Sequence, residues 1–186
     1  YTTEKKYRDK FMSLLIAWTN NQNKIAWPVW ESYSVAERII NVGLCMDLLQ
    51  GEELDWQWLK RFIGQHANNL SKYLEYHGID TNNHILKDAQ ALLYAGIILN
   101  RGSFIDTARK IYLDELEREF TLDGWHTEHS FHYHSIVVNR YLEAILLSKR
   151  HNLSFDLISK KILKKSIINI ITCIQNSDYA FRIGDT

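Results

Sequence analysis

The sequence predicts an all-α fold, in which antiparallel helical hairpins form part of an (α/α) toroid. Apolar residues recur every three or four positions almost throughout the 186 residues, and this is the period of an amphipathic helix. The chain contains a single Pro and eight Gly, so few positions interrupt that period. The hairpins have similar layouts, and no short repeat motif of a solenoid is present. A ring or partial ring of hairpins is therefore favoured over an open solenoid.

The period predicts seven helices, which we expect at residues 4–19, 34–49, 54–76, 84–100, 103–120, 130–150 and 154–175. The whole chain, 1–186, is long enough for one domain with a sizeable core. Cys45 and Cys173 lie far apart within apolar helical stretches, which predicts two buried free thiols rather than a disulfide.

The overall charge and hydropathy exclude two classes of partner. The 22 Lys and Arg residues balance the 22 Asp and Glu residues, so no global basic charge points to nucleic acid. Hydrophobic residues make up 46% of the chain, but no apolar run is long enough to span a bilayer. We therefore expect a ligand held by local groups, with no nucleic-acid partner, no membrane span and no cofactor.

The connections between the helices are of two kinds. The second and third, fourth and fifth, and sixth and seventh helices are joined by the short polar turns QGEE, RGS and HNLS. The other three connections are the longer segments NNQNKIAWPVWESY, HGIDTNN and TLDGWHTEH. Short turns make neighbouring helices antiparallel, so every second connection lies at the same end of the array. The three long segments should therefore meet at one end, where we expect one composite site.

The first long segment leads into the second helix and is rich in tryptophan. Trp27 and Trp30 in WPVWESYSVAER are candidates for a platform that stacks on sugar rings. Arg38 follows one turn into the helix and is a candidate to hold a carboxylate. The alternative is a hydrophobic staple capped by tryptophan, with Arg38 on the surface. The residues alone leave both interpretations open.

The second long segment ends in TNNH, residues 81–84, at the start of the fourth helix. Thr81 or an Asn can cap the helix, but one cap is enough, so Asn83 and His84 exceed the need. Asp88 lies four residues after His84 on the same helical face, where a carboxylate can fix the tautomer of the imidazole. Helix capping alone is the alternative for this motif.

The third long segment and the start of the sixth helix form DGWHTEHSFHYH, residues 123–134. Asp-Gly marks a turn, and Ser130 is suited to cap the helix. Tyr133 and His134 follow Ser130 by three and four residues, so the three side chains share a face. Arg140 continues that face seven residues after Tyr133. A tyrosine flanked by histidine on such a face suits proton transfer.

The four histidines of this stretch also raise the question of a metal site. Zinc takes three or four ligands in a tight tetrahedron, which a bent loop could build from His126, His129 and His134. The helical phase directs His132 elsewhere, and the H-x2-H-x2-H-x-H spacing lacks the usual helical pair at i and i+4. We therefore expect no metal here.

Taken in order, the three segments resemble the heparinase II/III-like polysaccharide lyases. The stretches that carry the resemblance are WPVWESYSVAERIINV, TNNHILKDAQAL, LDGWHTEHSFHYHSIVV and the closing RIGDT, which is similar to a Gly-Asp segment of that family. The resemblance implies an (α/α) toroid followed by a β-sandwich domain that is absent from this chain, which would be an incomplete toroid. It also implies β-elimination on a uronic-acid-containing polysaccharide, such as a glycosaminoglycan or alginate, by a periplasmic or secreted protein.

The resemblance implies roles for particular residues. Asn83 and His84 match the residues that neutralise the uronate carboxylate, and Tyr133 matches a tyrosine that takes part in proton transfer. The expected substrate-binding residues are Trp27, Trp30, Arg38, Trp125, Glu128, His134 and Arg140. Family members commonly take a further catalytic His or Tyr from the sandwich domain, so we expect this chain alone to be inactive or nearly so.

Two other functions stay open beside the lyase. A glycoside hydrolase on an (α/α) scaffold would use paired carboxylates, for which Asp123 and Glu128 are the candidates. The other alternative is a non-catalytic glycan-binding domain, for instance in the assembly of a surface polysaccharide.

Overall fold

The computed structural model describes residues 4–22, 29–49, 54–77, 81, 83–155, 157 and 160–175. Within these residues the chain forms seven helices and no strand, apart from an isolated bridge between Phe120 and His126. The helices are α1 (Lys5–Asn21), α2 (Ser32–Leu48), α3 (Trp56–Leu70), α4 (His84–Leu99), α5 (Gly102–Glu119), α6 (Phe131–Arg150) and α7 (Lys161–Gln175). The all-α prediction and its seven helices are confirmed. The closing RIGDT segment lies outside the described residues.

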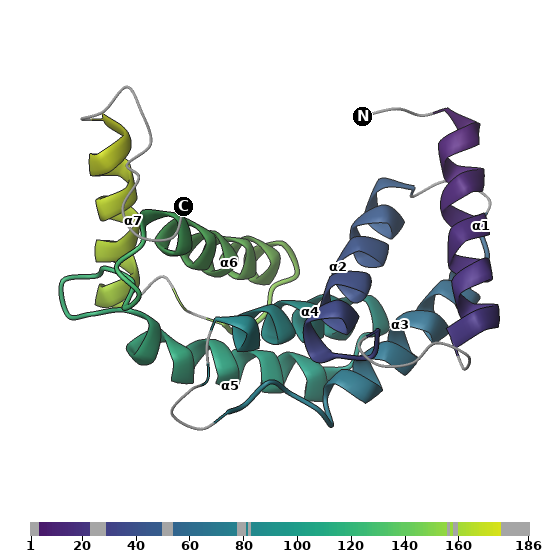
Figure 1. Ribbon diagram of the computed structural model, residues 1–186, viewed down its shortest axis with the longest axis horizontal. Coiled ribbons are helices and arrows are strands. Elements are labelled where there is room, and N and C mark those ends of the chain that lie inside the picture. Colours follow the sequence, from purple (N-terminus) through teal and green to yellow (C-terminus); the bar gives the residue numbers. More distant parts are fainter. Residues whose placement is uncertain are drawn as a thin grey trace.

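The helices form an open arc, with α1 and α7 at its two ends (Figure 1). α4 lies in the middle of the arc and packs against α2, α3, α5 and α6. Figure 1 shows α3 and α5 along the outer side of the arc, while α2 and α6 rise on the inner side. This alternation of inner and outer helices is the layout of a partial (α/α) toroid, as the sequence predicted.

The inner helices α2, α4 and α6 run in the same direction. At the amino ends, the ring of Tyr33 on α2 lies 4.9 Å from the ring of His84 on α4. At the carboxyl ends, Asp47 on α2 forms an ion pair of 3.2 Å with Arg150 on α6. The amino ends of the inner helices, which follow the long connections, therefore lie at one end of the arc.

The long connections contact one another at that end. The Ser32 hydroxyl, at the start of α2, donates a hydrogen bond of 2.9 Å to Glu75 in the segment between α3 and α4. Arg118, at the end of α5, donates a hydrogen bond of 3.2 Å to the backbone carbonyl of Thr81. These contacts show that the first and second long segments meet, as the alternation of loop lengths predicted, and that the end of α5, from which the third segment continues, contacts the second.

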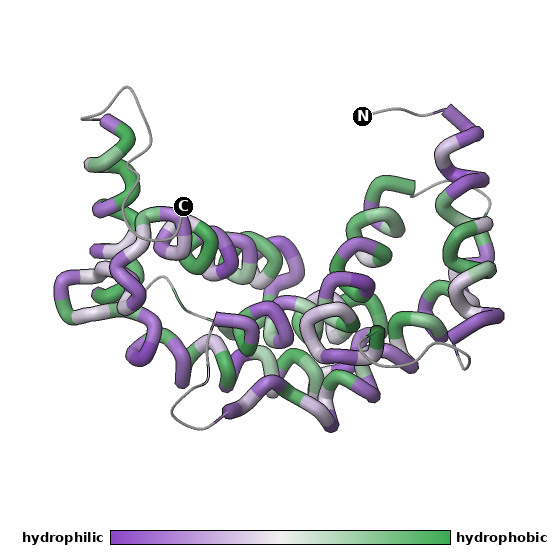
Figure 2. The backbone as a smooth tube through the Cα atoms, viewed as in Figure 1, coloured by the Kyte–Doolittle hydropathy of each residue, from purple (hydrophilic) through white to green (hydrophobic). Residues whose placement is uncertain are grey.

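The centre of the core is α4, in which eleven of the 16 residues are buried. A helix that is buried nearly all round has neighbours on all sides, which agrees with its central place in the arc. The peripheral helices are amphipathic instead, and Figure 2 shows hydrophobic and hydrophilic stretches alternating along α5 and α7. The candidate site is therefore built on the helix that is most fully buried among those that the structure describes.

Two predicted helix boundaries are wrong for a tertiary reason. α3 ends at Leu70 rather than at residue 76. Beyond that end, the backbone N–H of Glu75 donates to the carboxylate of Asp88 on α4, at 2.9 Å, and not to a helical carbonyl. α7 begins at Lys161 rather than at residue 154, and the non-helical stretch before it inserts Leu157 into the core, where this side chain is fully buried.

The state of the two cysteines and the membrane-spanning potential of the helices were also predicted from the sequence. Cys45 and Cys173 are free thiols, as predicted, but each is half-buried rather than fully buried. Burial raises the pKa of the Cys45 thiol. In the part of the chain that the structure describes, no helix has both the length and the apolar character needed to cross a membrane.

Candidate active site

Asn83, the residue before α4, is held by an arginine from α6. Its backbone carbonyl and its side-chain Oδ1 both accept hydrogen bonds from Nη1 of Arg140, the latter at 2.9 Å. Asn83 occupies the N-cap position of α4, but its side chain makes no capping hydrogen bond. Both residues are only 7% exposed, and burial lowers the pKa of Arg140. Helix capping alone therefore does not account for Asn83.

His84, the first residue of α4, is held by a carboxylate from the preceding segment. Its Nδ1 lies 2.8 Å from Oε1 of Glu75, whose other oxygen accepts the hydrogen bond from Ser32. The Tyr33 ring lies against the imidazole at 4.9 Å. An ionised carboxylate can only accept hydrogen bonds, so the proton of this contact lies on Nδ1. The His84 side chain is 41% exposed, so a ligand can reach it.

Sequence spacing predicted Asp88 as the carboxylate that fixes His84, but the contact to Nδ1 comes from Glu75. Asp88 is fully buried, and its Oδ2 accepts the hydrogen bond from the Glu75 N–H. Burial raises the pKa of Asp88 to about 7, and the charge of Glu75 adds to that shift while the N–H bond opposes it. Glu75 lay in a stretch predicted as helix, so no sequence signal singled it out.

A groove of about 410 Å³ lies along the inner helices beside this cluster. Its walls include Tyr33 and Arg140, which contact His84 and Asn83 respectively. The groove is lined by Tyr33, Glu37, Ile40, Asn41, Leu44, Lys87, Gln90, Ile136, Asn139, Arg140 and Glu143. The predicted residues Asn83, His84 and Arg140 thus adjoin a hollow that α2, α4 and α6 build together.

Charges of both signs line this groove. Nζ of Lys87 lies 2.8 Å from the Glu37 carboxylate, which links α4 to α2. The Glu143 carboxylate accepts hydrogen bonds from the amide of Gln90 and the hydroxyl of Tyr94, which links α6 to α4. Most of the lining side chains carry hydrogen-bonding groups, which suits a polar ligand better than a wholly apolar one.

Tyr133 lies on the face of α6 that continues the groove. It precedes Ile136 and Arg140 by three and seven residues, which places it about 10 Å before Arg140 along the helix axis. Its half-buried ring stacks on His126, with the ring centres 6.4 Å apart and the planes inclined by 17°. Its backbone N–H donates to the Ser130 hydroxyl at 3.4 Å, which confirms Ser130 as the N-cap of α6.

His134 and His126 are buried and tie the third long segment to its neighbours. Nδ1 of His134 accepts a hydrogen bond of 3.2 Å from the His126 N–H, and its Nε2 donates to the Ser166 carbonyl of α7 at 3.1 Å. Nε2 of His126 donates to Glu119 at 2.6 Å. Burial lowers the pKa of His134, which favours the neutral ring. His134 was predicted to bind substrate, but these bonds enclose it in the protein, where it supports the segment.

The histidines of this segment are not arranged as a metal site. Among the residues that the structure describes, no group of three or more His, Cys, Asp or Glu side chains could hold a metal ion. His126 and His134 direct their Nε2 atoms to protein acceptors, whereas His129 is exposed in a left-handed turn with φ of 54°.

Trp30 and Arg38 lie in an aromatic cluster near the amino end of α2. The Arg38 guanidinium lies 4.6 Å from the ring centre of Trp18 and 5.5 Å from that of Trp30. Trp30 also stacks on His66, with ring centres 5.4 Å apart. Burial lowers the pKa of Arg38 to about 10. Arg38 is thus half-buried and engaged in packing, whereas the staple interpretation placed it on the surface. Trp27 lies outside the described residues.

Three more predicted residues lie in the third long segment. Trp125 is half-buried, with its ring centre 4.9 Å from that of His134, and Glu128 is exposed. Asp123 is exposed too, and the hydrogen bond that it accepts from Thr121 lowers its pKa. The general acid of a glycoside hydrolase needs a raised pKa. Asp123 therefore does not suit that role.

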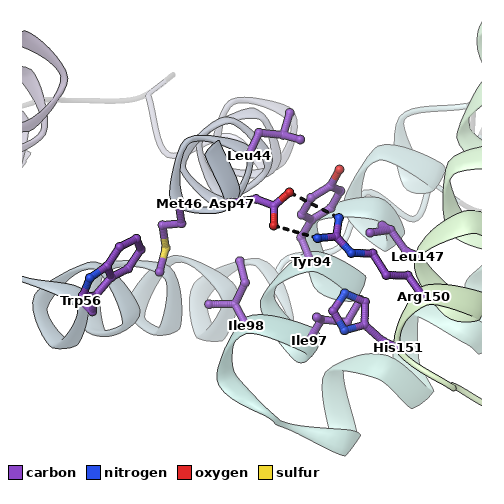
Figure 3. Close-up of a pocket in the computed structure, with 11 residues that line it drawn as sticks. Leu44, Met46, Asp47, Trp56, Tyr94, Ile97, Ile98, Leu147, Arg150 and His151 are labelled. Atoms are coloured by element: carbon purple, nitrogen blue, oxygen red, sulfur yellow. Dashed lines mark hydrogen bonds and ion pairs between the residues drawn. The ribbon is translucent and has the colours of Figure 1, made fainter. Parts of the chain in front are cut away.

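A second hollow, of about 490 Å³, lies at the opposite ends of the inner helices (Figure 3). Figure 3 shows the ion pair between Asp47 of α2 and Arg150 of α6 in its wall, with Tyr94 of α4 beside them. None of the residues that the sequence singled out for chemistry lines this hollow. The candidate chemistry is thus confined to the amino ends of the inner helices.

Comparison with known proteins agrees with this geometry. The family model described as Heparinase II/III N-terminus matches residues 1–180 of the chain. A heparin-sulfate lyase of Bacteroides thetaiotaomicron is 26% identical over 163 residues, which cover 83% of this chain and 23% of that protein. The chain thus spans about a quarter of the length of this relative.

Solved structures share the helical arc. The crystal structure of heparinase III matches with a TM-score of 0.73 at 23% identity, over 92% of this chain and 28% of that one. Heparan sulfate lyase HepC from Pedobacter heparinus matches with a TM-score of 0.71 at 21% identity, over 92% of this chain and 29% of that one. With the family match over nearly its whole length, the chain belongs to the heparinase II/III family, whose N-terminal region it matches.

Proposed function

We propose that this chain is the toroid domain of a polysaccharide lyase that cleaves a uronic-acid-containing polysaccharide by β-elimination. The observation that carries the proposal is the joint placement of Asn83, His84 and Arg140 at the amino end of α4, beside the polar groove. A helix amino terminus attracts anions, and a nearby guanidinium adds to that attraction. The carboxylate of a uronic acid fits such a position. Membership of the heparinase II/III family supports the same chemistry.

Asn83 and His84 are the proposed carboxylate-neutralising residues. Arg140 occupies Oδ1 of Asn83, so the amide N–H groups are the part of that side chain that can donate to a ligand. Hydrogen bonds to the uronate carboxylate spread its charge, which makes the neighbouring C5 proton easier to remove and stabilises the enolate-like intermediate. One such preorganised donor typically contributes about 2.7–4 kcal/mol to transition-state stabilisation.

Tyr133 is the proposed proton-transfer residue. β-Elimination removes the C5 proton, forms a C4=C5 double bond and breaks the C4–O4 bond, so that O4 leaves with a proton. The Tyr133 hydroxyl would supply the proton to O4, and a His or Tyr of the β-sandwich domain would take the C5 proton. A tyrosine on the face that continues the groove supports this assignment.

The activity is proposed for the longer protein. The partner domain is a β-sandwich that completes the site, and the substrate class is an acidic polysaccharide such as a glycosaminoglycan or alginate. A periplasmic or secreted location would give access to such polymers. The 186-residue chain alone would then show little or no turnover, because one of its proton-transfer groups would be missing.

The test is the ultraviolet absorbance of the unsaturated product when the full-length protein meets candidate uronate polymers. Asn83→Ala and Tyr133→Phe should each lower kcat/KM about 100- to 1000-fold, as the loss of a transition-state donor does. Glu117→Gln, on the exposed side of α5, is the matched control and should retain the wild-type rate.

Three outcomes would contradict the proposal. An unchanged kcat/KM in both variants would show that Asn83 and Tyr133 take no part in the reaction. Cleavage products without a double bond would point to a hydrolase, and tight binding without turnover by the full-length protein would point to a glycan-binding domain.

A further inference from the structure

Glu75 is fixed in place at three points, one on α2 and two on α4. Its Oε1 contacts Nδ1 of His84 at 2.8 Å, and its Oε2 accepts from the Ser32 hydroxyl at 2.9 Å. Its backbone N–H donates to Oδ2 of the buried Asp88 at 2.9 Å. Side chain and backbone are thus both held, so the carboxylate has little freedom to leave the imidazole.

The same contacts determine which His84 nitrogen faces Glu75. His77 also approaches the Glu75 carboxylate, but its Nε2 lies 3.8 Å from Oε1, beyond the length of a hydrogen bond. The Tyr33 ring lies against one side of the His84 ring and opposes a flip of the imidazole. A carboxylate accepts only, so the proton between the two groups belongs to Nδ1. Neutral histidine in water favours the other tautomer, with the proton on Nε2.

We propose that Glu75 is a positioning residue for His84, which it holds in one orientation with the proton on Nδ1, and that Ser32 and Asp88 hold Glu75 in turn. Because Nδ1 stays bonded to Glu75, proton exchange with a ligand takes place at Nε2. Nε2 is an acceptor in the neutral ring and an N–H donor to an anion in the imidazolium. The catalytic consequence of this arrangement rests on the proposed lyase function, whereas the tautomer does not.

The tautomer of His84 can be measured without any activity. Long-range ¹H–¹⁵N correlation of the ¹⁵N-histidine-labelled chain at about pH 8.5, above the ordinary pKa of histidine, reports which ring nitrogen carries the proton. The His84→Gln spectrum assigns the signals. We expect a protonated Nδ1 in the wild type and in Glu75→Gln, whose amide oxygen still accepts. In Glu75→Ala the population should move mostly to protonated Nε2.

His77→Ala is the matched control, because it removes the other histidine near the same carboxylate and should leave His84 unchanged. Wild-type His84 with its proton on Nε2 would overturn the proposal, even if the alanine variant failed to fold. The same tautomer in the wild type and in a folded Glu75→Ala would overturn it too. Signals of the buried His66 report whether each variant is folded.

Turnover of the full-length protein separates this proposal from the lyase function. Glu75→Ala should lower kcat about 10- to 100-fold, the range typical when a metal-bound histidine loses the partner that orients it, and Glu75→Gln should recover part of the loss. A shifted tautomer with unchanged turnover would overturn the proposed role of His84 in the lyase and leave the positioning by Glu75 intact.

Discussion

Two buried ionisable side chains, those of Arg140 and Asp88, help to hold the site together. The Arg140 guanidinium donates hydrogen bonds to two oxygens of Asn83, and these bonds offset part of the free-energy cost of burying its charge. Asp88 is less well compensated: its Oδ2 accepts from Glu75, but its Oδ1 is buried without a hydrogen-bond partner among the described residues. Burial of an incompletely bonded carboxylate accounts for its raised pKa.

Asp88 should make the stability of the protein fall as pH rises. Its folded-state pKa is about 7, against an ordinary value of 3.8, so the native state binds this proton more tightly than the unfolded state. The stability that the protonated form contributes is complete below about pH 4 and is lost as pH rises through 7, with a span of at most about 4 kcal/mol. Asp88→Asn should remove that component.

The measurement is the difference in unfolding free energy between Asp88→Asn and wild type, from urea titrations between about pH 4 and 8. The difference isolates Asp88 because other titrating groups, such as the buried His66, are common to both proteins. Glu117→Gln, at an exposed carboxylate of α5, is the control for loss of a negative charge and should show no fall of that size. A pH-independent difference for Asp88→Asn would contradict the raised pKa.

At the scale of elements, one glycine lets the third long segment dock against α7. Gly124 has a φ of 87°, a conformation that side chains other than glycine rarely adopt. A Cβ at this position would lie 2.6 Å from Cβ of Lys165 and 2.9 Å from the backbone nitrogen of Ser166. The same Ser166 accepts the hydrogen bond from His134. The third long segment, α6 and α7 therefore meet at Ser166, which Gly124 approaches closely and to which His134 donates.

Gly124→Ala should destabilise the protein by at least about 2 kcal/mol, because the left-handed conformation and the steric contact act together. Gly102→Ala is the matched control, since Gly102 begins α5 and a Cβ there would meet nothing within 4 Å. It should be neutral or stabilise by up to about 1 kcal/mol. Equal effects of the two substitutions in thermal unfolding would show that Gly124 is not needed for docking.

At the scale of the whole molecule, α4 couples the site to the core. Its first residues carry the candidate chemistry, and its remaining length is packed between inner and outer helices. A substitution that destabilises the packing of α4 should therefore destabilise the whole arc, whereas a substitution of an exposed side chain should not.

Leu93→Ala, at a fully buried position of α4, should cost about 2–5 kcal/mol of unfolding free energy, from lost apolar burial and the cavity that remains. Leu146→Ala, where the α6 side chain is 67% exposed, makes the same chemical change and should alter stability by less than about 0.5 kcal/mol. Chemical denaturation of both variants compares them directly. Similar losses would mean that α4 is not the centre of the core.

The sequence by itself determined the number of helices, the all-α class and the end at which the long segments meet. Helical periodicity and loop length are local properties, encoded within one helix or one connection, so they can be read without the fold. Ser130 as a cap and the motif TNNH at a helix start are local in the same way, and both lie where predicted. The ordered motifs also led to the family that the chain matches.

Only the tertiary structure decided which side chains meet. Glu75 replaces Asp88 as the partner of His84, and Arg140 takes both oxygens of Asn83. His134 of α6 is enclosed by the third long segment and α7. The partners of Asn83 and His134 come from distant parts of the chain. The partner of His84 depends on where the preceding helix, α3, ends. Helical spacing places a residue on a face, but the neighbour across that face depends on the packing of other helices.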